Sequence, residues 1–518
     1  MFLSAVDGRL VDATGAPVLL RGVGLGNWLL PEGYMWTFEP PGPQSPREIE
    51  ALLDDLVSRE RAGRFWAGFR RLFITDADLA RIAAEGLNHV RLPINARVVQ
   101  ADDGSLRPDG IALVDWLIER CRVHGLWVVL DLHGAPGGQT GTNIDDSPRG
   151  RPELFEDRRY QELTVALWRE LARRYRDEPV VAGYDLLNEP LPNEYQHTYR
   201  EQLVALYQEL TTAIRAEDSQ HLIIYEGTHW ASNWEIFTEV WDARSVLQFH
   251  RYWSPPDRPG IARYLEVRDR LGLPIYMGEG GENNLDWLQT AFQLYEDEQI
   301  SWNFWPWKKI ETFTSPCSIV APSGWSSIVD YAAGKGPRPD SDEAWGTLTD
   351  LVGALDIERC VYRPEVLNAI LRRPPLRLPA SGFSFRGEGR SYHTTGARPH
   401  AGFRADDRVS IVHTGEREAQ LHFEHTRGNA RADDDRLLVR LEPGDWLSYD
   451  VVLDQPARLA ITVEGEAPLV QLRIDNTDLD PADANPVTTP LLPAGRHAVR
   501  VTAAHPALLD GLIVASAP

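Results

Sequence analysis

The chain has 518 residues, of which 43% are hydrophobic and 25% are charged, and its formal net charge is −23 at pH 7. This composition excludes a disordered chain, and the acidic balance argues against nucleic acid and anionic membranes as partners. At roughly 100–200 residues per domain, the length predicts about three domains, or one large barrel with a smaller unit. Sixteen of the 17 tryptophans lie at or before Trp345, so the indoles belong to the first two-thirds of the chain.

The N-terminus and the cysteines bear on location and on metal binding. Residues 1–15 contain no basic segment followed by an apolar run, and no stretch reaches the ~18 apolar residues of a membrane span. We therefore expect a cytoplasmic protein without membrane insertion, with secretion of a longer precursor as the alternative. The cysteines Cys121, Cys317 and Cys360 form no CxxC motif, so neither a disulfide framework nor a zinc site is expected.

Between residues 17 and 355, short apolar runs alternate with stretches of helical periodicity. The eight runs are PVLLRGVGL, NHVRLPI, LWVVLDLH, VVAGYDLLNEP, HLIIYEG, SVLQFHRYW, LPIYMGEG and ISWNFWPW. Helices are expected between them at residues 75–86, 109–124, 159–175, 197–216, 235–242, 260–271 and 285–298. Eight strand-and-helix units in this length predict an α/β fold, a (β/α)8 TIM barrel.

Two stretches depart from this alternation. Residues 28–72 form a long insertion after the first strand, with a helix expected near residues 47–59, and such loops usually shape the active face of a barrel. After a proline-rich stretch at 371–379, eight short alternating runs predict an all-β sandwich. We therefore predict a catalytic barrel over residues 1–372 and an accessory β-sandwich over residues 373–518.

Polar residues stand where the predicted strands end, which is where a barrel carries its catalytic groups. Two of them are glutamates on different strands, Glu189 and Glu279. Glycoside hydrolysis needs one carboxyl group as acid and a second as nucleophile or base, about 5–5.5 Å apart for retention or about 6.5–9.5 Å for inversion. The other residues at these ends are Arg91, His133, Asn188, His250, Tyr252, Trp305 and Trp307.

The series HVRLP, DLH, LNEP, FHRY, MGEGG and FWPWK resembles the retaining glycosidases of glycoside hydrolase family 5, over roughly residues 8–355. The stretches RGVGLGNWL, DLHGAPGGQTG and FWPWK are similar to the exo-β-1,3-glucanase and β-glucosidase branch of that family. The resemblance implies that Glu189 is the acid/base and Glu279 the nucleophile. No metal or organic cofactor is expected, because two carboxylates suffice for this mechanism.

The resemblance also implies roles for the surrounding residues. Glu189 should lie in a dry or like-charge environment that raises its pKa, whereas Arg91 and Tyr252 should keep Glu279 ionised. Asn188 is expected to bind the sugar 2-hydroxyl, and Trp305 to form the apolar platform under the sugar. The predicted substrate-binding residues are Arg91, His133, Asn188, His250, Tyr252, Trp305 and Trp307.

Some assignments stay open at this point. Glu282 lies close to Glu279, but Glu279 is preferred as nucleophile because it directly ends its strand. Glu226 ends the fifth strand and is either a supporting or a sugar-binding carboxylate. Lysine occurs three times in the chain, and two of the three adjoin the last tryptophan pair, so we expect either Lys308 or Lys309 to contact sugar.

In the C-terminal part, EPGDWLSYDVVL is similar to a strand of the jelly-roll carbohydrate-binding modules of families 6 and 35, with Trp446 expected in the core. The sequence as a whole predicts a retaining exo-acting β-glycosidase for β-glucosides or short β-gluco-oligosaccharides. The alternatives are a β-mannosidase, an endo-glycosidase or a hydrolase of glycolipid glycans, and a non-catalytic carbohydrate-binding protein. The expected partner is a carbohydrate, and the sequence does not indicate the oligomeric state.

Overall fold

The computed structural model describes residues 2–142, 144–395, 402–414, 423, 436–466, 470–479 and 485–517. The chain forms two compact units. The first contains Met1–Arg251, Tyr264–Gly280 and Ser301–Tyr362, and the second contains Tyr252–Arg263, Gly281–Ile300 and Arg363–Pro518. The predicted boundary between residues 372 and 373 differs from this grouping, because the second unit also takes in α13 (Pro364–Leu371) and two earlier segments. Whether residues 1–372 and 373–518 are separate domains stays a prediction.

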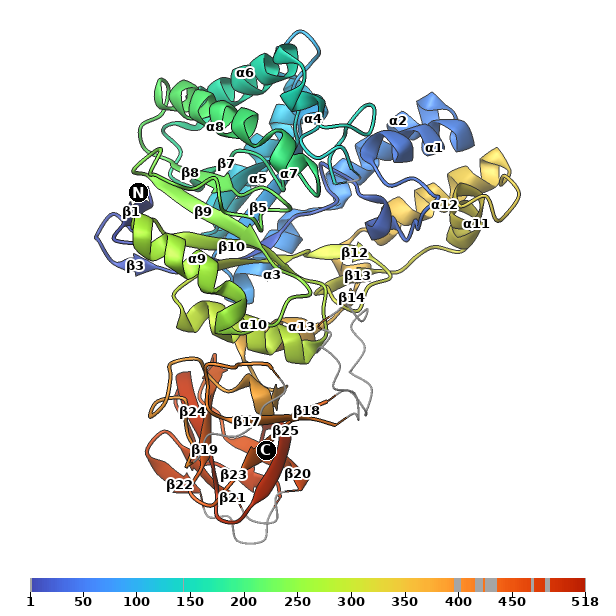
Figure 1. The fold of residues 1–518 in the computed structure, drawn as a ribbon. Coiled ribbons are helices and arrows are strands. Elements are labelled where there is room, and N and C mark those ends of the chain that lie inside the picture. The colour runs from blue at the N-terminus through green and yellow to red at the C-terminus, as the bar shows by residue number, and fades with distance from the viewer. Residues whose placement is uncertain are drawn as a thin grey trace. The chain divides into compact units, whose positions relative to one another are not determined.

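Eight parallel strands form a closed barrel (Figure 1). In the order of their hydrogen bonding they are β4 (Arg21–Gly24), β5 (His89–Asn95), β6 (Trp127–Gly134), β7 (Val181–Asp185), β8 (Leu222–Glu226), β9 (Ser245–His250), β10 (Ile275–Gly281) and β11 (Ser301–Trp305), which pairs back with β4. Almost every residue of these strands is buried, because one face of each strand packs in the barrel interior and the other face packs against the surrounding helices. The predicted TIM barrel is confirmed.

Helices follow most of the barrel strands. They are α3 (Asp76–Ala84), α5 (Pro108–His124), α6 (Arg158–Tyr175), α8 (Arg200–Arg215), α9 (Arg258–Leu271), α10 (Leu285–Asp297) and α12 (Ser341–Ala354). A capping box of Thr75 and Asp78 starts α3, and Gly125, with a φ of 70°, ends α5. The helix expected at 235–242 is wrong: between β8 and β9, all of whose residues are described, the chain forms turns and bridges.

Shorter elements complete the connections. They are α4 (Ala96–Val99), η2 (Glu153–Phe155), α7 (Tyr195–Thr198), α11 (Trp325–Ala332) and η3 (Ile357–Arg359), with a sheet of β12 (Lys308–Ile310), β13 (Cys317–Ile319) and β14 (Val361–Tyr362). At the N-terminus, β1 (Ser4–Val6), β2 (Arg9–Val11) and β3 (Pro17–Val18) form a small sheet. Leu3, Leu10 and Leu20 from this segment pack in one apolar cluster with residues of the barrel strands, such as Val246.

The insertion folds as η1 (Gly33–Trp36), α1 (Pro46–Val57) and α2 (Arg59–Leu72), and α1 and α2 contact α12. Its apolar centre is Trp36, whose ring lies 5.1 Å from that of Phe69 and 6.1 Å from that of Trp325. The indole nitrogen of Trp36 donates to Asn27 Oδ1 at 2.6 Å, which satisfies its polar atom. Trp36 is therefore a structural residue of the insertion.

The described residues in the C-terminal part of the second unit form two β-sheets. One contains β17 (Ser410–His413), β18 (Leu437–Leu441), β25 (Ala507–Ser516), β20 (Leu459–Glu466) and β23 (Val487–Thr488), with β15 (Leu376–Pro379) paired to β25. The other contains β16 (Tyr392–His393), β19 (Trp446–Leu453), β24 (Gly495–Ala503), β21 (Val470–Ile474) and β22 (Thr477–Leu479). A short η4 (Ala380–Gly382) follows β15. Of the eight short runs that predict the sandwich, AQLHFEH at residues 419–425 lies, apart from Phe423, outside the described residues.

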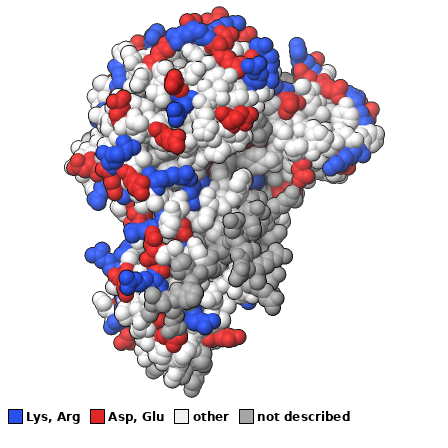
Figure 2. Space-filling view, in the orientation of Figure 1, with Lys and Arg blue, Asp and Glu red and all other residues white. Residues whose placement is uncertain are grey.

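Trp446 is not in the core, contrary to the prediction. It is half-buried, and the guanidinium group of Arg500 lies 3.7 Å from the centre of its ring. The likeness to carbohydrate-binding modules stays a prediction. Acidic and basic side chains are interspersed over the face of the protein that Figure 2 displays. Across the described residues, no helix combines the length and the apolar character that a bilayer crossing requires.

Candidate active site

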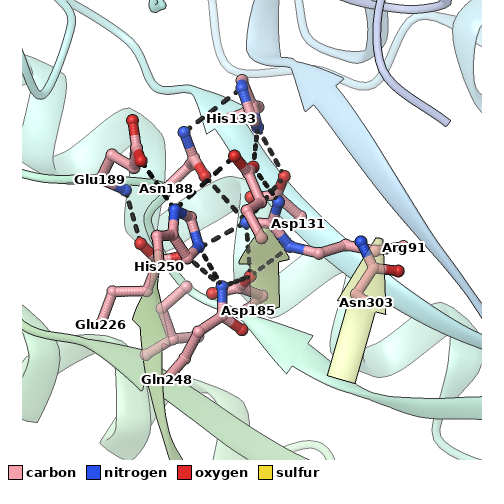
Figure 3. Close-up of polar contacts among 12 residues, drawn as sticks. Arg91, Asp131, His133, Asp185, Asn188, Glu189, Glu226, Gln248, His250 and Asn303 are labelled. Carbon is pink, nitrogen blue, oxygen red and sulfur yellow. Dashed lines mark hydrogen bonds and ion pairs between the residues drawn. The ribbon is translucent and has the colours of Figure 1, made fainter. Parts of the chain in front are cut away.

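Buried polar side chains fill the interior of the barrel at the carboxyl ends of its strands (Figure 3). They recur two residues apart, as in Asp131 and His133 on β6 or Gln248 and His250 on β9. Because side chains on a strand alternate between its two faces, the members of each pair point to the same side. The sequence thus stacks two polar layers inside the barrel.

The two predicted catalytic glutamates meet in this polar region. Glu189 follows β7 and Glu279 lies in β10, and their side chains are almost buried, with 9% and 3% of each residue exposed. His250 joins them: its Nδ1 lies 2.7 Å from Glu189 Oε1 and 3.6 Å from Glu279 Oε2. One carboxylate oxygen of each glutamate and His250 Nδ1 all lie within 4.8 Å of one another. The pair therefore has the close spacing that a nucleophile and an acid/base require.

Arg91, from β5, is the cation at the centre of the site. It forms an ion pair with the predicted nucleophile Glu279 and hydrogen bonds to Asn188 Oδ1 at 2.8 Å. Three further carboxylates surround its fully buried guanidinium group, namely Asp185 at 2.8 Å, Glu226 at 3.1 Å and Asp131 at 3.2 Å. The predicted role of Arg91 in holding Glu279 matches this arrangement.

The crowding of acids around one arginine shifts several pKa values. Burial alone would lower the pKa of Arg91, but the carboxylates around it raise that pKa well above its usual value. Burial raises the pKa of Asp131, and it raises the pKa of Glu226 to about 8. Burial would lower the pKa of His250, yet the charges of Glu226 and Glu279 raise it. We therefore expect His250 to be protonated and to donate a hydrogen bond to Glu189.

His133 is in the opposite protonation state. Burial lowers its pKa to about 4, so its ring is neutral near pH 7. Its Nδ1 lies 2.7 Å from Asp131 Oδ2, which places the single ring proton on Nδ1. Nε2 is then an acceptor, 3.3 Å from Asn188 Nδ2. His133 thereby orients the Asn188 amide, whose oxygen already accepts from Arg91.

Trp305 lies beside His133, with the two rings parallel within 3° and their centres 5.5 Å apart. Two glycines make room for the indole, Gly24 in β4 and Gly26 just after it: a Cβ on either would lie 2.5 Å from a ring carbon of Trp305. The indole nitrogen donates to Tyr34 Oη at 2.9 Å. The predicted platform residue is therefore in the site, and its close approach explains Gly24 and Gly26 of the RGVGLG sequence.

Trp307 does not line the site, which corrects its prediction as a substrate-binding residue. Lys308 does not line it either, so the expected sugar contact from one of the two lysines falls to Lys309 and stays a prediction. The side chains of Trp307 and Lys308 are fully buried and meet at Asp78, the capping residue of α3. Trp307 Nε1 donates to Asp78 Oδ1 at 2.9 Å, and Lys308 Nζ forms an ion pair with the same oxygen at 2.6 Å. Lys308 also donates to the carbonyls of Phe73 and Leu355, so its three protons are used in the core. Lys309 lies in a different environment: its Nζ is 5.2 Å from the centre of the ring of Tyr34, a residue of the insertion.

Tyr252 belongs to the second unit, where its carbonyl accepts a hydrogen bond from Asn283 Nδ2 at 3.1 Å. Its predicted role in holding Glu279 stays a prediction. In the described part of the first unit, Arg91, His133 and His250 are the cationic or imidazole groups within 4 Å of that carboxylate.

Sequence reasoning missed several residues of the site. Asp131, Asp185 and Gln248 lie in the barrel interior, and the insertion supplies Glu32, whose Oε1 is 3.9 Å from His133 Nε2, and Tyr34. The signal for Asp131 and Gln248 was their position two residues before a predicted site histidine. The insertion residues carried no comparable signal, because their place depends on how residues 28–72 fold.

Glu189, His250 and Glu279 also offer three potential ligand atoms for a metal ion. The arrangement does not suit one, because His250 Nδ1 is expected to carry the proton that it donates to Glu189. Arg91 in addition forms its ion pair with Glu279. We therefore treat these side chains as an acid–base group rather than as a metal site.

The comparisons with known proteins agree with this chemistry. The family model "Cellulase (glycosyl hydrolase family 5)" matches residues 61–310. The chain is 31% identical over 348 residues to the "Beta-xylosidase" of Phanerodontia chrysosporium, a match that covers 60% of this chain and 71% of that protein. It is 32% identical over 283 residues to the "Probable glucan 1,3-beta-glucosidase A" of Emericella nidulans, covering 50% of this chain and 66% of that protein. It is 27% identical over 303 residues to "Endoglucanase C" of Acetivibrio thermocellus, covering 46% and 85%. The names of these three relatives differ in the substrate that they state.

Proposed function

The chain belongs to glycosyl hydrolase family 5 and is an enzyme that hydrolyses O-glycosides, and from this premise we propose that it is a retaining, exo-acting β-glycosidase. Its proposed substrates are β-glucosides and short β-gluco-oligosaccharides. The observation that carries the proposal is the closeness of Glu189 and Glu279, since one carboxylate oxygen of each lies within 4.8 Å of the other. Retaining enzymes hold their two carboxyl groups about 5–5.5 Å apart, whereas inverting enzymes leave room for a water molecule.

In the first step, a carboxylate oxygen of Glu279 attacks the anomeric carbon and forms a covalent glycosyl-enzyme. The bond from that carbon to the leaving oxygen breaks, and Glu189 gives its proton to this oxygen. In the second step, Glu189 takes a proton from a water molecule whose oxygen attacks the same carbon. The bond to Glu279 breaks, and the sugar leaves with its original anomeric configuration.

The surrounding side chains prepare both glutamates for these steps. The ion pair with Arg91 favours the ionised form of Glu279, which is the form that attacks. His250 donates to Glu189 Oε1 and leaves the other oxygen of that carboxyl group for the proton. Asn188 is fixed from two sides, by Arg91 and by His133, and we assign its amide to the sugar 2-hydroxyl.

Exo action is supported by the insertion. Its residues Glu32 and Tyr34 reach His133 and Trp305, so residues 28–72 contribute to the wall around the reaction centre. Both catalytic glutamates are more than nine-tenths buried, which suits a pocket for one terminal sugar better than an open cleft. The name of the Emericella nidulans relative is consistent with this mode of action.

The catalytic assignment is tested with Glu279→Gln. Removing the nucleophilic carboxylate should lower kcat on an aryl β-glucoside by at least about 10⁴-fold, without loss of the folded state. Glu282→Gln is the matched control, because Glu282 lies three residues further along and is half-buried. A Glu279→Gln enzyme with near-normal turnover, or a larger loss in the control, would overturn the assignment.

Substrate and stereochemistry are tested together. A panel of aryl β-glucoside, β-mannoside, β-xyloside and β-galactoside is assayed, and NMR follows the first-formed anomer of the product. We expect the highest kcat/KM on the glucoside and a β-anomer as first product, and an α-anomer would contradict retention. Oligosaccharides labelled at the reducing end should lose single glucose units, and internal cleavage would instead indicate an endo-glycosidase.

A further inference from the structure

The backbone at Glu189 has an unusual conformation. Glu189 adopts a φ of 46°, in the left-handed region that residues with a side chain rarely occupy. Such a backbone is strained, and it persists where the surrounding structure holds it in place. The groups that hold the Asn188–Glu189 peptide therefore also set the direction in which the Glu189 side chain leaves the backbone.

Gln139 holds the carbonyl end of this peptide. Its side chain is fully buried in the loop after β6, and its Nε2 donates to the carbonyl of Asn188 at 3.0 Å and to that of His133 at 2.6 Å. Its Oε1 accepts from the backbone N–H of Ala135 at 3.0 Å. All three contacts agree with one orientation of the amide group, so Gln139 ties the ends of β6 and β7 together.

Glu226 holds the other end of the same peptide. Its Oε2 accepts from the backbone N–H of Glu189 at 2.7 Å. Its Oε1 accepts from Arg91 Nη2 at 3.1 Å, and Arg91 in turn is paired with Glu279. The peptide plane before Glu189 is therefore fixed at both ends, and one of these contacts continues to the nucleophile.

We propose that Gln139 and Glu226 are positioning residues that clamp the Asn188–Glu189 peptide and thereby aim the Glu189 carboxyl group at the leaving oxygen. This inference rests on the proposed function, in which Glu189 is the acid/base. Neither residue needs to touch substrate. His250 still bonds Glu189 Oε1 when the clamp is loosened, so a variant should misdirect proton transfer rather than abolish it.

The leaving group separates misdirected proton transfer from general damage. The dinitrophenolate of a 2,4-dinitrophenyl β-glucoside leaves without protonation. The phenolate of a phenyl β-glucoside is a poorer leaving group and needs a proton from the acid. Gln139→Met keeps the length of the side chain but cannot donate to the two carbonyls. Because general acid catalysis contributes about 10²–10⁴-fold, we expect kcat/KM of this variant to fall about 10–100-fold on the phenyl substrate and less than about 3-fold on the dinitrophenyl substrate.

Gln100→Met is the matched control. Gln100 is also buried, and its amide also donates to two backbone carbonyls, those of Gly104 and Leu163, but it bonds no residue of the site. In the Gln100→Met variant, kcat/KM should change by the same factor on both substrates. If Gln139→Met does not fold, Gln139→Glu serves instead, because it keeps the acceptor for Ala135 but cannot donate to both carbonyls.

The outcomes are distinct. Equal losses on both substrates, or no loss on either, in the Gln139 variant would overturn the clamp. Glu189→Ala is measured in the same series, and it should show an even larger selective loss on the phenyl substrate, with activity on the dinitrophenyl substrate restored by azide. Failure of that variant to discriminate would overturn the proposed function itself.

Discussion

The two ends of the barrel strands differ in what their inward side chains do. On β8, Ile224 packs in the apolar cluster, and two residues later Glu226 enters the polar group around Arg91. On β9, Val246 belongs to the same apolar cluster, and His250, four residues later, bonds Glu189. Residues on the same face of one strand thus pass from packing to chemistry within about 7–13 Å, at a strand rise of 3.2–3.4 Å per residue.

This difference shows how the barrel balances stability against function. The apolar end gains free energy from burial, roughly in proportion to the area removed from water. The polar end buries charges, which is costly unless each one keeps its partners. The carboxylates around Arg91 are held by that cation, by protonated His250 and by neutral donors such as Gln248, so the polar end depends on few residues.

The largest expected effect is at the polar end. Arg91→Met removes the guanidinium group from among Asp131, Asp185, Glu226 and Glu279, so the ionised carboxylates of this group lose a buried cation that compensates their charge. We expect a loss of about 3–5 kcal/mol in the free energy of unfolding, together with loss of activity. Urea unfolding followed by tryptophan fluorescence measures the free energy of unfolding.

Arg158→Met is the control for this prediction. Arg158 pairs with Glu209 through both terminal nitrogens, at 2.7 and 2.6 Å, but 56% of its side chain is exposed. Solvent screens that pair, so its removal should cost less than about 1 kcal/mol. Equal losses of unfolding free energy in the two variants would mean that the buried ion pairs of Arg91 contribute no more to stability than a surface ion pair.

At the apolar end, Leu222→Ala should cost about 2–5 kcal/mol of unfolding free energy, because it leaves a cavity among packed side chains. The folded variant should keep its kcat/KM, since Leu222 lies at the start of β8 and Glu226 at its end. Unfolding and kinetics are measured on the same preparation. A lower kcat/KM in the fully folded variant would mean that the two ends are not independent.

A further expected effect concerns acid stability. His89 precedes Arg91 by two residues on β5, and burial lowers its pKa from 6.5 to about 3, with Nε2 at 2.9 Å from Tyr276 Oη. Below pH 6.5, His89 binds a proton in the unfolded chain but stays neutral in the folded one. The free energy of unfolding therefore falls as the pH drops toward 3. Between pH 7 and pH 4 this loss should be about 3 kcal/mol, and neutral His133 adds to it.

The variant His89→Gln tests this slope, because it keeps a polar group near Tyr276 but does not titrate. Urea unfolding at pH 7, 5.5 and 4 should show a smaller loss of stability in the variant than in the parent chain. The same decline in both would mean that other groups cause the acid sensitivity.

The sequence was a good guide where the signal is local. LWVVLDLH and SVLQFHRYW are apolar runs that end in polar residues, and they became β6 and β9 with His133 and His250 at their ends. The glutamates after VVAGYDLLN and LPIYMG met as expected. The helix predicted at 235–242 failed, because apolar spacing over a few residues does not distinguish a helix from bridged turns.

Trp305 and Trp307 show where local reasoning stops. By alternation they should share a face, but β11 ends at Trp305, and after Pro306 the chain no longer follows the pleat. Trp305 meets His133 and Tyr34, whereas Trp307 and Lys308 meet Asp78 on α3. The rarity of lysine correctly marked Lys308 as unusual, but its partner is a buried carboxylate rather than a sugar.

The sequence by itself determined the barrel and the two glutamates, because strand periodicity and the polar ends of strands are properties of neighbouring residues. Only the tertiary structure decided which side chains gather around Arg91. The distances that matter there join residues about 40 to 190 positions apart, such as Arg91 with Asp131 and with Glu279. They depend on the register between strands, which shifts at Met277/Glu279 and again at Val128/Val129, and on the fold of the insertion that brings Tyr34 to Trp305.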